Sequence, residues 1–259
     1  MNSALILQDV VYVVALLAIG YPLGCYIYKI YNGERVALMR IFAPLEQLLY
    51  RVMGVDEEQQ MHAKKYASSV LWFSLFGFLI VMGLHLVQAW LPLNPEQLEN
   101  TSVHLAYNTA ASFVSNTNWQ AYSGETTLSY LTQMAGLTVQ NFVSAATGIA
   151  VLFVLCRGFV RRETKNLGNF WSDLVKITLY ILLPLSVVVC LILVSQGVVQ
   201  TLDPYASYTT LEGTQGVLPL GPAASQIAIK QLGTNGGGFF GVNSAFPYEN
   251  ATPLSNIIE

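Results

Sequence analysis

Four stretches of the chain are long enough and apolar enough to cross a membrane. They cover residues 4–28, 67–91, 128–156 and 174–195. A spanning helix needs about 20 consecutive, mostly apolar residues. The pattern therefore predicts four transmembrane helices, with a kink in the fourth at Pro184 and a further helix that begins near Pro253.

Two shorter segments alternate with these spans. Residues 103–115 and 222–232 each suit about three turns of helix, which is too short to cross a bilayer. Pro222 suits the first turn of the second segment, where its missing N–H leaves no helical bond unmade. Each segment runs into a polar, uncharged loop, Ser-Asn-Thr-Asn-Trp-Gln at 115–120 and Gln-Leu-Gly-Thr-Asn-Gly-Gly-Gly-Phe-Phe-Gly at 231–241. This layout is typical of a pore loop, because irregular backbone at membrane depth is tolerated only inside protein or beside a wet cavity.

Composition agrees with a membrane protein. Of the 259 residues, 53% are hydrophobic and 10% are charged, whereas about a quarter of the residues of a soluble domain are charged. Cys25, Cys156 and Cys190 lie in or beside apolar segments without metal-ligand spacing, so we expect them to be packing residues. The expected surroundings are the lipid bilayer, and no nucleic-acid partner is expected.

Lysine and arginine are distributed unevenly along the chain. Most lie between the first and second spans or between the third and fourth: Lys29, Arg35, Arg40, Arg51, Lys64 and Lys65, then Arg157, Arg161, Arg162 and Lys165. The stretch 92–127 has none. Because cytoplasmic loops carry an excess of these residues, both basic loops are expected in the cytoplasm. The N-terminus and both polar loops are then expected to be extracytoplasmic.

The order span, short helix, polar loop, span occurs twice. Residues 67–157 are expected to form the first repeat and residues 158–259 a second, truncated one, after an extra transmembrane helix and basic cytoplasmic loop in residues 1–66. The Thr-Asn pair at 117–118 aligns with the pair at 234–235. The predicted fold class is an all-α integral membrane protein of tandem transmembrane helix–pore loop–transmembrane helix repeats, in an incomplete set.

The chemistry of the two loops suits a monovalent cation. A selectivity filter replaces the hydration shell of the ion with main-chain carbonyl oxygens, which carry no full charge and so let the ion leave again. Gly236, Gly237 and Gly238 readily adopt the unusual φ/ψ angles that aim successive carbonyls inward. Asn116 and Asn118 tolerate positive φ better than most residues. Each short helix is also expected to point its negative C-terminal end at the membrane centre.

Side chains of these loops are expected to brace the backbone or to add ligands. The candidate residues of a potassium filter are Asn116, Thr117, Asn118, Gln120, Thr234, Asn235, Gly236, Gly237 and Gly238. Glu125 and Glu249 follow the loops and are expected either to concentrate cations at an outer mouth or to be solvated or structurally paired. No catalytic residue and no cofactor is expected, and potassium is the transported ligand.

Other interpretations of these residues stay open from the sequence. A Thr-Asn-Gly-Gly-Gly run in isolation is most often a flexible turn, whereas a phosphate-binding loop is disfavoured because no Lys-Ser/Thr follows it. Polar residues in the third span are expected either to line a wet cavity or to bond to neighbouring helices: Thr132, Gln133, Thr138, Gln140, Asn141 and Ser144. His85, inside the second span, is expected to be hydrogen-bonded within the helix bundle.

Four runs of the sequence resemble a known family. They are Pro-Leu-Asn-Pro at 92–95, the stretch from Asn116 to Tyr130, the stretch from Gln133 to Phe142, and Leu-Gly-Thr-Asn-Gly-Gly-Gly-Phe-Phe at 232–240. The chain resembles the potassium-binding subunits, KdpA, of the bacterial Kdp potassium-transporting ATPase. That family belongs to a superfamily of potassium transporters with four tandem helix–pore loop–helix repeats. The resemblance implies that residues 116–118 and 234–236 form two of four filter quarters.

The resemblance also implies the partners and the place of action. It implies an ATP-driven importer in the bacterial plasma membrane, with a separate P-type ATPase subunit and two smaller membrane subunits. This chain has no Asp-Lys-Thr-Gly phosphorylation motif and no P-loop, so it is expected not to hydrolyse ATP itself. Family members continue through two more repeats. The chain as given is therefore expected not to form a potassium-selective pore alone.

Two other functions compete with this one. A passive potassium channel or cation symporter subunit of the same superfamily uses similar loops, and a non-conducting assembly protein is the third possibility. Co-purification with a P-type ATPase separates the importer from the channel, and ion flux through the chain alone argues against the assembly protein. The long match from Asn116 to Tyr130 favours the importer.

Overall fold

The structure is a computed structural model that describes residues 3–160 and 166–259. Four of its helices are long and apolar enough to cross a membrane: Ile6–Tyr31, Ala63–Trp90, Thr132–Val160 and Phe170–Ser195. At about 1.5 Å per residue, each exceeds the roughly 30 Å hydrocarbon core of a bilayer. The four predicted spans are therefore confirmed as helices. Arg161, Arg162 and Lys165 of the predicted basic loop lie outside the described residues.

The chain divides into two compact units, Met1–Met53 and Gly54–Glu259. The first unit contains α1, Ser3–Tyr31, and α2, Met39–Met53. The side chains of α1 that the structure describes are mostly exposed and apolar. An apolar surface of this length is stable only when lipid or another protein covers it.

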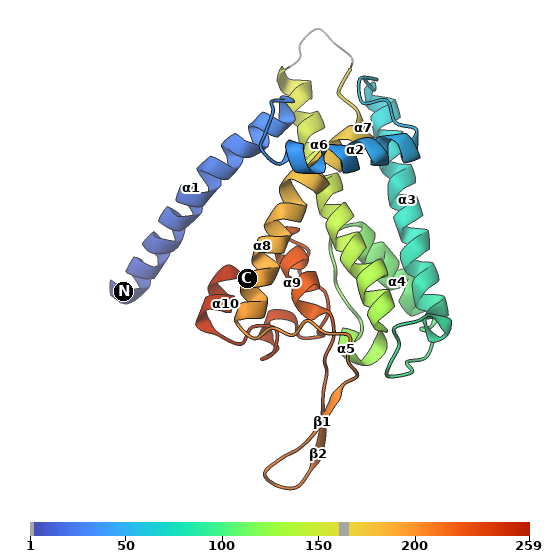
Figure 1. Cartoon of the computed structure of the whole chain (residues 1–259), viewed down its shortest axis with the longest axis vertical. Helices are drawn as coiled ribbons and strands as arrows, with labels where there is room; N and C mark the ends of the chain where they lie inside the picture. The colour runs from blue at the N-terminus through green and yellow to red at the C-terminus, as the bar shows by residue number, and fades with distance from the viewer. Residues whose placement is uncertain (1–2, 161–165) are drawn as a thin grey trace. The chain divides into compact units, whose positions relative to one another are not determined.

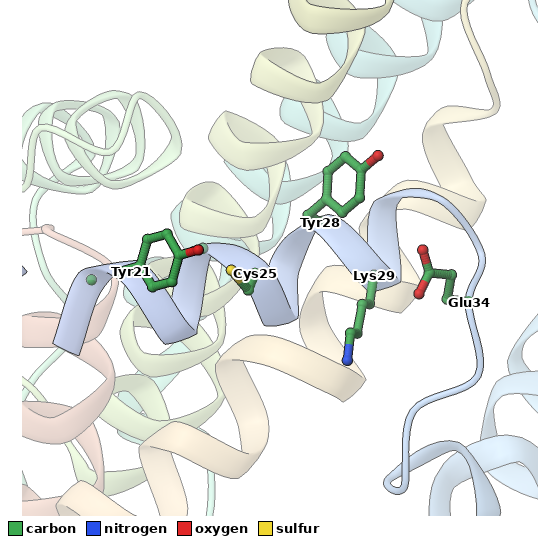
Figure 2. Close-up of a pocket in the computed structure, with 7 residues that line it drawn as sticks. Tyr21, Cys25, Tyr28, Lys29 and Glu34 are labelled. Atoms are coloured by element: carbon green, nitrogen blue, oxygen red, sulfur yellow. The ribbon is translucent and has the colours of Figure 1, made fainter. Parts of the chain in front are cut away.

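A glycine ends α1. Gly33 has φ +73°, and the amides of Gly33 and Glu34 donate to the carbonyls of Ile30 (3.0 Å) and Lys29 (2.9 Å). This left-handed cap fits glycine, which has no Cβ to strain the turn. Figure 2 shows the residues that line an open hollow along this end of the helix, among them Tyr21, Cys25, Tyr28, Lys29 and Glu34.

The second unit uses one arrangement twice (Figure 1). A shorter helix packs back along the span before it: α4, Val103–Val114, along α3, Ala63–Val87, and α9, Ala223–Leu232, along α8, Leu183–Ser195. Both short helices begin and end close to the predicted residues. Pro222 is the N-cap of α9 rather than a residue of its first turn.

The third and fourth spans are not uniform α-helices. α6, Val139–Val160, continues from the π-helical segment Thr132–Thr138, and α7, Phe170–Ile177, joins α8 through the π-helical segment Thr178–Leu182. Pro184 explains the second of these segments, because it has no N–H to donate to the carbonyl four residues earlier and its ring crowds that carbonyl. Where the sequence predicts a kink at Pro184, the structure thus has a π-helical segment just before that residue.

The connections contain several short elements. They are the 3₁₀ turns Gln88–Trp90 and Asn243–Ala245, α5, Gly124–Thr127, the hairpin strands β1, Ala206–Thr209, and β2, Gln215–Leu218, and α10, Pro253–Ile258. The strands are antiparallel, with Ala206 opposite Leu218. α10 begins at the predicted residue, after a capping box between Thr252 and Ser255. The hairpin and α2 were not predicted.

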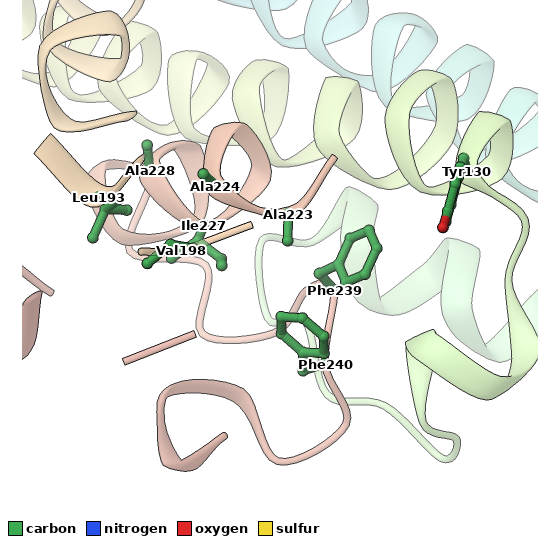
Figure 3. Packing of buried hydrophobic residues seen from close by; sticks show 9 residues of the cluster. All are labelled: Tyr130, Leu193, Val198, Ala223, Ala224, Ile227, Ala228, Phe239 and Phe240. Carbon is green, nitrogen blue, oxygen red and sulfur yellow. The ribbon is translucent and has the colours of Figure 1, made fainter. Parts of the chain in front are cut away.

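Small residues let the short helices approach the spans closely. Ala106 and Ala110 of α4 and Ala224 and Ala228 of α9 are fully buried and lie one turn apart on each helix. Figure 3 shows the apolar cluster around α9, which is formed by Tyr130, Leu193, Val198, Ala223, Ala224, Ile227, Ala228, Phe239 and Phe240. The packed interior of this unit therefore surrounds the short helices and the loops after them.

A buried ion pair fastens three helices at the other end of the unit. The Arg157 guanidinium of α6 donates to both carboxylate oxygens of Asp173 in α7 (2.5 and 2.8 Å). The hydroxyl of Tyr66 in α3 donates to the same carboxylate (2.9 Å). Because both charged side chains are more than nine-tenths buried, loss of Asp173 removes a doubly hydrogen-bonded carboxylate from a buried guanidinium.

We therefore expect Asp173→Ala to destabilise the protein by about 3–5 kcal/mol, since the buried Arg157 guanidinium loses both of its hydrogen bonds to the carboxylate. Glu57→Ala is the matched control, because the Lys176–Glu57 pair (3.3 Å) is partly exposed and worth about 0–1 kcal/mol. Thermal unfolding in detergent measures both variants. A Tm of Asp173→Ala equal to that of Glu57→Ala would show that the buried pair does not fasten these helices.

Candidate functional site

The loops after α4 and α9 have the same backbone geometry. Positive φ occurs at Asn116 (59°) and Asn118 (57°) in the first loop, and at Thr234 (52°) and Gly236 (89°) in the second. Threonine is β-branched and rarely adopts this conformation, which costs on the order of 1–3 kcal/mol. Backbone strain of this kind is typical of functional sites.

The hydrogen bonds that close the two helices match as well. The amide of Thr117 donates to the carbonyl of Ser112 (3.1 Å), and the amide of Asn235 donates to the carbonyl of Lys230 (3.0 Å). Asn116 thus corresponds to Thr234, Thr117 to Asn235 and Asn118 to Gly236. The alignment expected from the sequence, which equates Thr117 with Thr234, is therefore wrong by one residue. The two loops share their backbone angles and not the identity of their side chains.

The two loops contact each other directly. The Gln120 side chain forms a two-way pair with Gly238, donating to its carbonyl (2.9 Å) and accepting from its amide (3.0 Å). Asn118 donates from its side-chain amide to the carbonyl of Gly237 (3.3 Å). A Cβ at Gly237 would overlap the main-chain carbonyl of Asn118. Glycine is therefore required at 237 for close approach and at 236 for its positive φ.

Polar side chains of α6 hold both loops. Asn141 accepts from the side-chain amide of Asn118 and donates to the carbonyl of Gly237 (3.4 Å). Ser144 donates to Asn116 Oδ1 (2.7 Å) and accepts from Asn235 Nδ2 (3.4 Å). Of the two roles left open for these residues, bonding to neighbouring segments is the one that Asn141 and Ser144 fulfil.

Two buried glutamines extend this support. Gln133, in the π-helical segment before α6, donates to the carbonyl of Phe239 (3.3 Å). Gln226 of α9 donates to Gln133 Oε1 (3.2 Å). Gln226 was not singled out from the sequence, because a single glutamine in a short helix carries no pattern that points to a partner.

Hydrogen bonding divides the loop carbonyls into two groups. The carbonyls of Trp119, Gly233, Gly237 and Gly238 each accept from a side chain. By contrast, no donor within residues 3–160 and 166–259 reaches the main-chain oxygens of 116–118 or 234–236. These carbonyls lie just after the C-terminal ends of α4 and α9, where the helix dipole adds negative potential. Main-chain oxygens that are left without a donor are acceptors of the kind that can bind a cation.

The two acidic residues after the loops have different surroundings. Glu125 is half-buried and accepts from the amide of Gly241 (2.7 Å). Glu249 is fully buried and forms an ion pair with Lys230, which is itself 1% exposed. Of the roles left open for Glu249 by the sequence, the ion pair with Lys230 corresponds to the structurally paired carboxylate rather than to one that concentrates cations at an outer mouth.

Lys230 has a larger role than the sequence suggested. It lies in the last turn of α9, and a Cβ at Gly238 would come within 3.2 Å of its side-chain Cδ. A signal for it exists in the sequence, since Lys230 is the one basic residue in residues 177–259. The charge needs a buried counter-ion there, and Glu249 supplies it.

Two tyrosines connect the first loop region to the segment before the hairpin. Tyr130 donates to the carbonyl of Asp203 (2.7 Å), and Tyr205 donates to the carbonyl of Glu125. Burial, with smaller contributions from Glu96 and Asp203, raises the pKa of Tyr130 to about 12. Its hydroxyl therefore stays protonated at neutral pH and remains a donor.

No cluster of three or more His, Cys, Asp or Glu side chains suited to a metal ion occurs in the described part of the chain. His85 lies away from the loops, fully buried, with Nδ1 2.8 Å from the carbonyl of Val81. The candidate ligands are thus main-chain oxygens, and the amide side chains around them fix their positions.

These helices and loops define a multi-pass membrane protein in which short helices and polar loops alternate with the spans. A family model described as potassium-transporting ATPase A subunit, KdpA, matches residues 10–259. The chain belongs to this family, as the resemblance of its loop motifs indicated.

Curated relatives named potassium-transporting ATPase potassium-binding subunit agree with this. The one from Listeria welshimeri is 61% identical over 256 residues, which are 98% of this chain and 46% of the relative. The one from Herpetosiphon aurantiacus is 57% identical over 268 residues, covering 100% of this chain and 46% of the relative. A Clostridium botulinum relative is 56% identical. The chain spans about half the length of the curated relatives it matches.

Proposed function

We propose that this chain supplies two sectors of a potassium-selective filter in the potassium-binding subunit of an ATP-driven importer. The observation that carries the proposal is the matched pair of loops, in which three successive carbonyls on each side accept no hydrogen bond from the described residues. The names of the relatives, potassium-binding subunits of a potassium-transporting ATPase, support potassium as the ion.

The carbonyls of residues 116–118 and 234–236 are the proposed ligands. They take the place of water around a dehydrated potassium ion, and they carry no formal charge that would trap it. Gln120, Gly237 and Gly238, which were candidates for the filter themselves, hold the ligand segments in place through the contacts between the loops. The Glu125 carboxylate supports the second loop through Gly241 in the same way.

The Lys230–Glu249 pair is proposed to keep the region behind the second loop electrically neutral. An unpaired ammonium close to a cation path would repel the ion, at about 2 kcal/mol for a separation of roughly 8 Å and an effective dielectric constant of about 20. The paired carboxylate removes most of that repulsion, while the lysine stem packs against Gly238.

The remaining parts of the proposed importer lie in other chains. A P-type ATPase subunit that hydrolyses ATP, together with two smaller membrane subunits, completes the complex in the bacterial plasma membrane. The word ATPase in the names of the relatives supports such a partner, and this chain itself has no phosphorylation motif or P-loop. Potassium is the transported ligand rather than a cofactor.

The proposed filter is tested by Gly236→Ser in the complete subunit within its complex. Serine at φ +89° costs roughly 1–2 kcal/mol in backbone strain, so the potassium concentration for half-maximal ATPase stimulation should rise about tenfold, and discrimination against similar cations should weaken. Gln120→Arg, which breaks the pair with Gly238 and adds a positive charge, should raise it further.

Gly148→Ser is the matched control, because Gly148 lies in α6 with open space around its Cβ position and without positive φ. Its potassium dependence should be unchanged. If Gly236→Ser and Gln120→Arg both retain the original potassium dependence in assembled complexes, these loops are not the filter.

The orientation is proposed from the basic loops, with the N-terminus and both polar loops extracytoplasmic. Single cysteines at Gln97 and Glu58, both exposed, test it in a background in which Cys25, Cys156 and Cys190 are replaced. A membrane-impermeant thiol reagent applied to intact cells should label Gln97→Cys and spare Glu58→Cys, and permeabilised cells should show labelling of both. The reverse pattern in intact cells would overturn the orientation.

A further inference from the structure

Helix α2 carries an apolar stripe on its exposed side. Ile41, Leu45, Leu48 and Val52 recur at intervals of three and four residues, so they lie along one face of the helix. Their exposed fractions are 68%, 40%, 51% and 75%. The opposite face carries Tyr50, which is buried. A stripe of four exposed aliphatic side chains on a 15-residue helix needs an apolar environment.

Chain connectivity keeps α2 close to the bilayer surface. Residues 32–38 join it to the end of α1, and residues 54–62 join it to the start of α3. Both of those helices qualify as membrane spans. An extended chain reaches at most about 3.6 Å per residue, so α2 is tethered from both sides within roughly 30 Å of the membrane interface.

Basic residues accompany the stripe. Arg40 and Arg51 are exposed at the two ends of α2, on the flank of the stripe. Arg35 and Arg40, together with Val36, Ala37 and Met39, line a hollow of about 570 Å³ at the start of the helix. Arginine binds phosphate oxygens with two parallel hydrogen bonds, and the apolar stripe continues from the hollow along the helix.

We propose that α2 is an interfacial helix that binds anionic phospholipid. Ile41, Leu45, Leu48 and Val52 lie at the level of the upper acyl chains, while Arg35, Arg40 and Arg51 bind lipid phosphates. An amphipathic helix with this combination lies in the plane of the interface, and each arginine near an anionic surface adds about 1 kcal/mol of attraction. The proposal does not depend on the filter.

The stripe favours lipid over a protein partner. Protein interfaces are usually anchored by Trp, Tyr or Arg in the centre of the contact. Here the centre consists only of aliphatic side chains, and the arginines lie at the edges, as in helices that lie in the headgroup region. A protein partner on this face is therefore the competing outcome that the experiment has to separate.

Spin labels on the full chain in vesicles of phosphatidylcholine and phosphatidylglycerol test the position of the helix. Leu48→Cys reports on the stripe, and Gln47→Cys is the matched control one residue away on the arginine side, both in a background without the native cysteines. At each label, the ratio of the collision rate with oxygen to the collision rate with a water-soluble nickel chelate is measured. This ratio should be several-fold higher at position 48 than at position 47. Free access of the nickel chelate to both labels would contradict the proposal, and so would shielding of position 48 from both reagents, which indicates a protein contact.

The arginines are tested by changing the lipid charge. Replacing phosphatidylglycerol by phosphatidylcholine should reduce the immersion of the label at position 48, and the double variant Arg40→Gln, Arg51→Gln should lose this dependence. Lys64→Gln with Lys65→Gln, in α3, is the matched control of equal charge change and should keep it. Equal immersion in both lipids for the unsubstituted helix would overturn the role of the arginines.

Discussion

A carbonyl oxygen that binds an ion must be left without a hydrogen-bond donor from the protein, and the backbone around it must be held in place. Two segments just after α4 and α9, 116–118 and 234–236, contain carbonyls for which the described residues supply no donor. Thr117, Thr234 and Gly236 are exposed. Asn141 and Ser144 of α6 and the Gln120–Gly238 pair supply the rigidity. Part of the buried polar interior of the second unit, Asn141 and Ser144 with Gln133 and Gln226, thus bonds to the two loops or to each other.

The two loops reach one geometry by different chemistry. The first uses asparagine at its positive-φ positions, whereas the second uses Thr234 and Gly236. Ser112 of α4 corresponds in the repeat to Lys230 of α9. The Ser112 hydroxyl donates to the carbonyl of Trp119, whereas Lys230 forms a buried ion pair with Glu249. A filter assembled from such sectors is chemically asymmetric around the ion, although its backbone is repeated.

Elements that are marked by a long apolar run or by a proline at a helix start could be predicted from the sequence. The four spans, both short helices and the start of α10 follow from apolar length and from Pro253. The exposed hairpin and α2 could not, since neither is long enough to give a membrane signal. Within the site, the glycines and asparagines were identifiable from their backbone freedom. The pairing of Glu249 with Lys230 was not, because it joins residues whose distance depends on the path of the intervening loop.

The central claim is that potassium is held by the main-chain oxygens of residues 116–118 and 234–236. Thallium is a heavy monovalent cation of similar size to potassium, and its anomalous diffraction gives its position directly. In crystals of the complete subunit soaked with a thallium salt, the account predicts a peak bounded by these two loops, which excess potassium removes. A potassium-competable peak at any other place, with none between the loops, would contradict it.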